Sequence, residues 1–211
     1  MDDLNAIADQ IRAEMSAITQ ARDNALAASR SLIRACALSI RAAHRSDFDE
    51  ARSHLDEAGQ LAAELRATAA NHPDLYYAGY TQDGLKEYVE AHLVLALIRQ
   101  QPLPGPADLD VIGATYLKGL AEASTEMRRR ILDIIRKDQQ LEEAERLLAA
   151  MDDIYTILIT FDFPDNVTYG LRRATDVVRG VLERTRGDLT MSLRQEKLQQ
   201  ALRDFEEKVN G

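Results

Sequence analysis

The sequence has little of what interrupts or cross-links a chain. It contains one cysteine, five prolines and ten glycines in 211 residues. The single Cys36 excludes an intramolecular disulfide and a zinc site built from cysteines. Because no linker rich in glycine, serine or proline divides the chain, we expect one domain over residues 1–211. Abundant alanine, leucine, glutamate and arginine favour helix throughout.

The chain also lacks a long apolar run and an excess of positive charge. No stretch approaches the ~18 apolar residues that would span a bilayer. The N-terminus opens with Asp2 and Asp3 instead of the apolar segment of a secretory signal, so we expect a cytoplasmic protein. The net charge of −9 argues against indiscriminate binding to nucleic acid or membranes, but it leaves room for a local basic patch.

Helical periodicity, interrupted by a few turn signals, predicts an all-α fold with seven helices. The expected ranges are 2–45, 47–70, 82–100, 109–136, 139–160, 167–186 and 190–209. The first is far longer than the roughly 11–12 residues of an average helix. Asp47 is expected to cap the second helix, Asp108 or Asp110 the fourth, and Gly187 with Asp188 to separate the last two. Short breaks are expected at 71–74 and 137–138.

The most informative feature is a pair of acids in an apolar helix. Glu87 and Glu90 lie one turn apart, and only Glu90 and His92 are polar within residues 88–98. A carboxylate buried there needs a cation, a metal ion or a proton, because removing the bare charge from water costs too much. Glu122 and Glu126 form a second pair on the next predicted helix. Four carboxylates on adjacent helices would suit a hard divalent metal.

Spacing alone leaves the second pair open. Glu142 and Glu145 have similar spacing to Glu87 and Glu90, and we interpret them as solvated surface. Glu122 and Glu126 lie opposite the apolar face of their helix, which favours a solvated face with Glu126 paired to a nearby arginine. The alternative is that this polar face lines an internal, water-filled cavity.

Four arginines form a stripe along the first predicted helix. Arg30, Arg34, Arg41 and Arg45 fall within about a 60° arc at 100° per residue. The planar guanidinium fork suits phosphates, so the stripe supports nucleic-acid binding. Salt bridges to acids of other helices are an equally open interpretation.

The histidines and nucleophiles suggest no further site. His44, His54, His72 and His92 show no ligand spacing with one another, and we interpret His92 as a core or interface residue. No Ser/His/Asp grouping, glycine-rich phosphate loop or CxxC motif can be assembled.

Several segments, in order, resemble the translin/Trax family of helical proteins that bind and cut RNA. Arg22–Leu26 through His44 resembles the long basic first helix of that family. Leu85–Ala91 is similar to the QEYVEA element of the catalytic subunit. Tyr116–Glu122 followed by Glu126–Arg129 resembles its DYLLGVADLTGELMRM element. Leu171–Val178 through Arg186 and Gly187 is similar to its late helix.

The resemblance implies a seven-helix bundle that assembles into a closed, octamer-like shell, with magnesium-dependent endonucleolytic cleavage of RNA inside. Trax-like subunits carry the acids, and both acidic pairs are present here, so the chain resembles that catalytic subunit, as a single-chain prokaryotic or archaeal-type homologue. The implied ligands of Mg²⁺ or Mn²⁺, and the implied catalytic residues, are Glu87, Glu90, Glu122 and Glu126. Arg30, Arg34, Arg41 and Arg45 would position single-stranded RNA. This places the second acidic pair on a cavity wall.

One position departs from the family pattern. The first acid of the second pair is Asp in the family, and here it is Glu122, whose extra methylene moves the carboxylate by roughly 1.3 Å. Glu122 would then be a weaker or water-mediated ligand. Two other hypotheses remain: a non-catalytic, translin-like protein that binds single-stranded RNA or DNA, and a helical scaffold without a nucleic-acid role.

Overall fold

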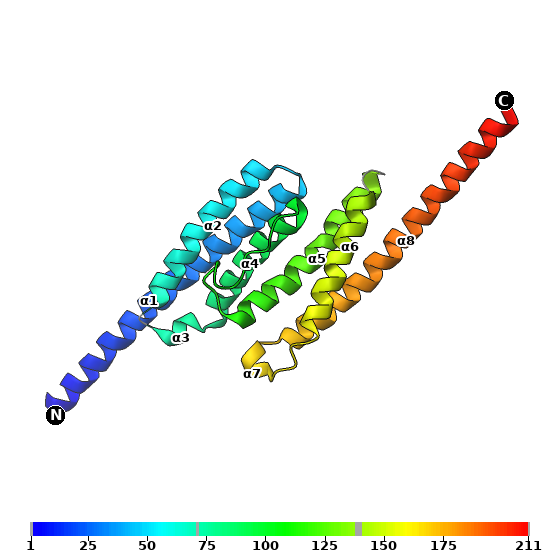
Figure 1. The fold of residues 1–211 in the computed structure, drawn as a ribbon. Coiled ribbons are helices and arrows are strands. Elements are labelled where there is room, and N and C mark those ends of the chain that lie inside the picture. The colour runs from blue at the N-terminus through cyan, green and yellow to red at the C-terminus, as the bar shows by residue number, and fades with distance from the viewer. Residues whose placement is uncertain (1, 71, 138–140, 211) are drawn as a thin grey trace. The chain divides into compact units, whose positions relative to one another are not determined.

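The structure is a computed structural model that describes residues 2–70, 72–137 and 141–210. Within these ranges the chain forms helices and no strand, which confirms the all-α prediction (Figure 1). The helices are α1 (Asp2–His44), α2 (Phe48–Ala69), α3 (Pro73–Tyr76), α4 (Gly79–Arg99), α5 (Gly113–Lys137), α6 (Leu141–Leu158), α7 (Asp165–Thr168) and α8 (Leu171–Asn210). Over the described part of the chain, none is long and apolar enough to cross a membrane.

The boundaries of α1, α2 and α4 follow the predicted signals. Asp47 caps α2, since its side chain accepts a hydrogen bond from the Glu50 amide at 3.2 Å. The proline-rich segment 101–106 follows the end of α4 at Arg99. The predicted break at 71–74 is present, since α2 ends at Ala69 and the short α3 begins at Pro73, although Asn71 itself lies outside the described residues. Asp138, in the second predicted break, also lies outside them.

The predicted cap of α5 is wrong, because both candidate acids stabilise the preceding loop instead. Asp108 accepts a hydrogen bond from the Gly105 amide at 2.7 Å. Asp110 has a left-handed backbone, with φ of 51°, and its carboxylate lies 3.0 Å from Nε of Arg66. The helix therefore begins only at Gly113.

The predicted break at Gly187 and Asp188 is absent, and α8 continues to Asn210. A single glycine inside a helix costs only about 1 kcal/mol, too little to end it without a proline. Asp188 is held within the helix by Arg128, at 2.8 Å. The chain turns earlier, where Tyr169 and Gly170 have φ of 50° and 85° after the short α7.

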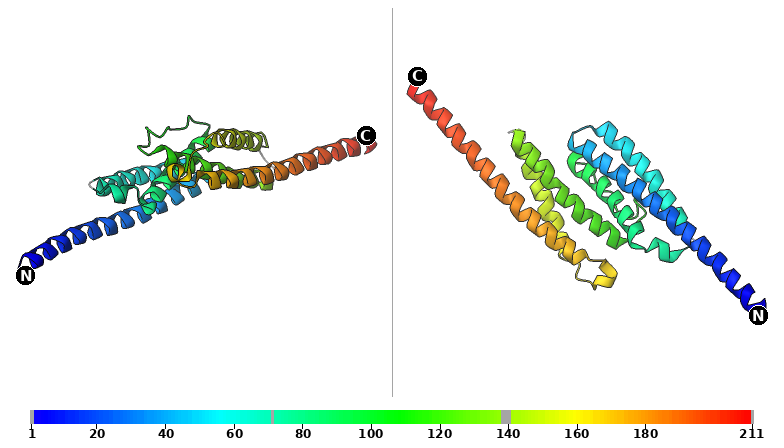
Figure 2. Two further views of the ribbon diagram at one scale, coloured as in Figure 1. Left: turned by 90° about the horizontal axis from the view of Figure 1, so that it is seen from below. Right: turned by 180° about the vertical axis from the view of Figure 1, so that it is seen from behind.

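The helices form two packed units, which we describe separately. The first contains Met1–Leu95 and Pro104–Gly119. In it α1 and α2 run antiparallel and side by side (Figure 2), tied by the Ser39 hydroxyl, which donates to the Ala51 carbonyl at 2.8 Å. The fully buried large side chains of this unit are Leu32, Leu65, Leu85, Val89 and Leu93. Residues 3–24 of α1 are mostly exposed and run past the end of α2.

The second unit contains Ala96–Leu103 and Leu120–Gly211. Here α6 packs against α8, and its fully buried large side chains are Met127, Ile131, Leu147, Met151, Leu158, Leu171 and Leu189. Beyond Leu193, α8 is exposed over its described residues. Because α4 and α5 each run from one unit into the other, the prediction of a single domain stays a prediction.

Candidate metal centre

Helix α4 carries the first acidic pair in the environment that the sequence predicts. Every residue from Tyr88 to Ile98 is buried except His92, which is half-buried. Glu90 is 8% exposed, and Glu87 is half-buried one turn earlier. The apolar run thus forms helix because its neighbours cover it on nearly all sides, and it carries Glu90 into that interior.

A glycine brings α5 very close to this part of α4. A Cβ atom at Gly119 would lie 2.6 Å from Cγ1 of Val89 and 2.9 Å from the Lys86 carbonyl oxygen. Only a residue without a side chain fits such a close approach. Gly119 therefore fixes where α5 passes α4, at the turn that contains Glu87. Glu122 follows Gly119 by three residues on the same helix, which places both near one face of α5.

Three of the four predicted acids come together. Glu87, Glu90 and Glu122 can each offer one carboxylate oxygen, and these three atoms lie within 4.8 Å of one another. Glu126, half-buried one turn further along α5, does not belong to this group. Carboxylate oxygens are the ligands that Mg²⁺ and Mn²⁺ prefer, so the donor set fits a hard divalent cation. Glu142 and Glu145 are exposed, in agreement with their interpretation as surface acids.

Two residues that the sequence did not assign to this site lie near the acids. The Nζ atom of Lys86 lies 3.1 Å from Oε1 of Glu87. The pKa of the buried Cys36 thiol, on α1, is raised by its burial and then by the negative charges of Glu87 and Glu90. The sequence feature that could have identified Lys86 is its position next to Glu87, just before the apolar run of the helix.

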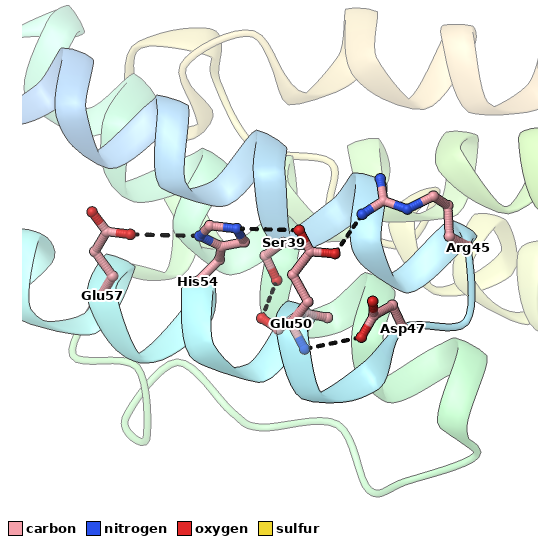
Figure 3. A network of polar contacts seen from close by, with 7 residues as sticks. Ser39, Arg45, Asp47, Glu50, His54 and Glu57 are labelled. Atoms are coloured by element: carbon pink, nitrogen blue, oxygen red, sulfur yellow. Dashed lines mark hydrogen bonds and ion pairs between the residues drawn. The ribbon is translucent and has the colours of Figure 1, made fainter.

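The four arginines of the predicted RNA-binding stripe are all exposed on α1. Arg45 forms an ion pair with Glu50, whose second oxygen lies 3.8 Å from Nε2 of His54 (Figure 3). This contact agrees with the salt-bridge interpretation for Arg45. Arg30, Arg34 and Arg41 make no ion pair with another described residue, so three guanidinium groups are exposed along α1 for an external anion.

His92 lies in the core, as predicted, beside Tyr88. The two rings meet edge to face with centroids 4.6 Å apart. Burial, followed by the positive charge of Arg52, lowers the pKa of His92 to about 4, against a smaller opposing effect of Asp56. Its buried Nε2 atom has no hydrogen-bond partner among the described residues. His92 is thus neutral at physiological pH and makes no contact with the acids that would mark it as a ligand.

An open hollow of about 920 Å³ lies elsewhere, around α7 and the start of α8. Phe161 and Phe163 line it together with Arg172 and Arg173, but three aspartates stand beside these arginines. The balance of charge there disfavours a phosphate, so the acidic group remains the candidate site.

Known proteins resemble the chain over nearly its whole length. No family model matches it. The uncharacterized protein MJ0175 of Methanocaldococcus jannaschii is 33% identical over 205 residues, covering 96% of this chain and 88% of that protein. The solved structures of AfC3PO, one of them in complex with duplex RNA, share 30% identity with a TM-score of 0.82, covering 89% of this chain and 97% of theirs.

A third solved structure, that of apo-NeC3PO, has a TM-score of 0.79 at 20% identity and covers 88% of this chain and 96% of its own, which supports the fold alone. AfC3PO and NeC3PO are C3PO proteins of the translin/Trax type. The identity to AfC3PO and its near-complete coverage carry the conclusion: this chain belongs to the translin/Trax family.

Proposed function

We propose that this protein is a divalent-metal-dependent endoribonuclease that cleaves single-stranded RNA within the cavity of a homo-oligomer. The observation that carries the proposal is the approach of three carboxylate groups, from Glu87, Glu90 and Glu122, in a chain of the translin/Trax family. Exposed acids often gather without a cation, but Glu90 is buried in an apolar helix, where two neighbouring carboxylates stay charged only if a cation balances them.

Each acid has a distinct part in this proposal. Glu87 and Glu90 hold the cation from α4, where close packing fixes their backbone. Glu122 holds it from α5, and Glu126 completes the site as a fourth or water-mediated ligand. A bound Mg²⁺ or Mn²⁺ supplies Lewis acidity toward water and toward the phosphate. The buried face of α4 excludes bulk water behind the acids, which strengthens their attraction for a cation.

The stripe on α1 supports the RNA-binding part of the proposal. Arg30, Arg34 and Arg41 are exposed without an ion pair among the described residues. Arg45 would have to exchange Glu50 for a phosphate. AfC3PO has been solved with duplex RNA, so both single-stranded and duplex RNA belong in the test of substrate preference.

Two apolar stripes support assembly. Leu4, Ile7, Ile11, Met15 and Ile18 are all exposed on the N-terminal part of α1. Met191, Leu198, Leu202, Phe205 and Val209 are exposed on the C-terminal part of α8. Both sets recur at intervals of three, four or seven residues, as on helices that pack against other helices. We propose that copies of this chain cover these stripes in an octamer-like shell, in the cytoplasm.

One observation favours a second function, that of a translin-like protein that binds single-stranded RNA or DNA without cutting it. Glu87 already has a cationic partner in Lys86, at 3.1 Å, which would satisfy that acid without a metal. The acids would then be structural.

Incubation of the purified protein with labelled RNA separates the two functions. The proposal expects single-stranded RNA to be shortened in Mg²⁺ or Mn²⁺ and to stay intact in EDTA. Binding without cleavage in any metal would establish the translin-like function. The absence of both binding and cleavage would point to a helical scaffold.

A further inference from the structure

Lys86 is a largely buried cation inside the turn of α4 that carries the acids. Its side chain is only 13% exposed, and its Nζ atom lies 3.1 Å from Oε1 of Glu87. Neighbouring residues on a helix point about 100° apart, so the lysine side chain must bend toward its neighbour to make this contact. An ammonium group that has lost most of its water is stable only beside negative charge.

The negative charge around Lys86 exceeds what Glu87 alone supplies. Glu90 lies one turn further along α4 and is 8% exposed. Both carboxylates act on the Cys36 thiol of α1, where they raise its pKa in addition to the effect of burial. Two carboxylates therefore share a region with little water, and Gly119 closes α5 onto the Lys86 backbone there.

We propose that Lys86 is the internal counter-ion of Glu87 and Glu90, a positioning residue that balances the acids when no metal is bound and opposes the binding of a divalent cation. The second half of this inference rests on the proposed function. A fixed ammonium group beside the ligands repels an incoming cation and competes for the oxygen of Glu87 that the cation needs. Lys86 thus keeps the empty acids folded in place and lowers the affinity for metal.

The test compares Mn²⁺ affinity, measured by titration calorimetry, in Lys86→Gln, Lys86→Arg and Lys118→Gln. Lys118 is a matched control, because it is also on the first unit and its Nζ lies 3.9 Å from Oδ1 of Asp83. Removing one charge a few ångströms from the cation should tighten Mn²⁺ binding of Lys86→Gln by about tenfold. Lys86→Arg should stay within about twofold of the wild type, since it keeps the charge. Lys118→Gln removes a charge that is paired with Asp83 and not with Glu87, so its gain should be smaller than that of Lys86→Gln.

Unchanged or weaker Mn²⁺ binding in Lys86→Gln, or an equal gain in Lys118→Gln, would overturn the inference. Thermal unfolding in EDTA is a second test, and it does not depend on metal binding. Lys86→Gln should lower the Tm, and adding Glu87→Gln should restore part of the loss, because the second change removes the unbalanced carboxylate. If the wild type binds no Mn²⁺, the proposed function fails, but thermal unfolding in EDTA still tests the role of Lys86. If the loss of Tm in the double variant equals the sum of the losses in Lys86→Gln and Glu87→Gln, the counter-ion role is overturned.

Discussion

Glu90 and His92 show how the same burial acts in opposite ways on an acid and a base. Both lie in the apolar part of α4, two residues apart. The carboxylate of Glu90 must be compensated there, and a metal ion is the compensation that we propose. The imidazole of His92 avoids the problem by staying neutral, since burial and Arg52 hold its pKa at about 4, below the ordinary 6.5.

The depressed pKa of His92 predicts a loss of stability in mild acid. The unfolded chain takes up a proton at His92 near pH 6.5, whereas the folded protein does so only near pH 4. Stability is therefore complete above pH 6.5 and falls as the pH drops toward 4. We expect His92→Phe, which keeps a ring against Tyr88, to gain about 1–2 kcal/mol relative to the wild type between pH 7.5 and 5.

Denaturant unfolding of both proteins at the two pH values measures this gain. Titration of the other ionisable groups is common to both proteins, so it cancels in the difference between their free energies of unfolding. A constant difference across the range would show that the pKa of His92 is the same in the folded protein and in the unfolded chain.

At the scale of elements, the close passage of α4 and α5 depends on Gly119. A Cβ atom there would clash with Val89 and with the Lys86 backbone, so Gly119→Ala should destabilise the protein by about 1–3 kcal/mol. It should also weaken metal binding, because the clash moves α5 and Glu122 away from α4. Gly187→Ala is the control: nothing lies within 4 Å of a Cβ there, so it should gain up to ~1 kcal/mol. Equal effects of the two changes on the Tm would contradict the close passage.

Helix α1 should confer salt-dependent RNA binding through its exposed arginines. Arg34→Ala combined with Arg41→Ala should reduce the slope of log K against log salt, because fewer counterions are displaced from the RNA. Arg12→Ala combined with Arg22→Ala removes the same charge from the same helix, at arginines that pair with Asp9 and Asp23, and should leave the slope nearly unchanged. Filter-binding titrations over a range of salt measure both. An equal change in slope in the two double variants would assign the effect to net charge.

Much of this arrangement could be predicted from sequence, and the failures have physical causes. The burial of Glu90 could be predicted from the apolar residues around it, because a helix with no polar face has to be covered on all sides. Spacing alone could not place Glu122, and only the family resemblance did, since a polar helix face has the same sequence pattern whether it meets water or a metal site. The break predicted at Gly187 was wrong because glycine often ends a helix. The ion pair between Asp188 and Arg128 supports α8 at this point, and it could not be predicted because the two residues are 60 apart in the chain.

At the scale of the whole molecule, the exposed stripes on α1 and α8 predict assembly. Large apolar side chains on consecutive turns are seldom left in water by a stable monomer. We expect light scattering to give a mass several times the 23.6 kDa of one chain. Ile7→Asp combined with Ile11→Asp should lower that mass, whereas Gln10→Asp combined with Gln20→Asp, at exposed polar positions of the same helix, should not. A single-chain mass for the wild type at micromolar concentration would contradict the shell.

The central claim, that buried acids bind a catalytic metal, is tested most directly at Glu90. Glu90→Gln keeps the shape of the side chain but removes the charge that a hard cation requires. If Glu90 is a ligand, the variant loses cleavage, retains RNA binding, and has an equal or higher Tm without metal, because repulsion among the acids is relieved. If Glu90 is only a structural ion-pair partner, the change leaves a cation unpaired and lowers the Tm by an amount equivalent to a few kcal/mol.

The decisive measurement is the rate of cleavage of labelled single-stranded RNA in Mg²⁺ by Glu90→Gln beside Glu142→Gln. Glu142 is an exposed acid on α6, and its loss should leave the rate unchanged. We predict no cleavage by Glu90→Gln, full cleavage by Glu142→Gln, and none by the wild type in EDTA. Full cleavage by Glu90→Gln, or cleavage by the wild type that persists in EDTA, would contradict the account.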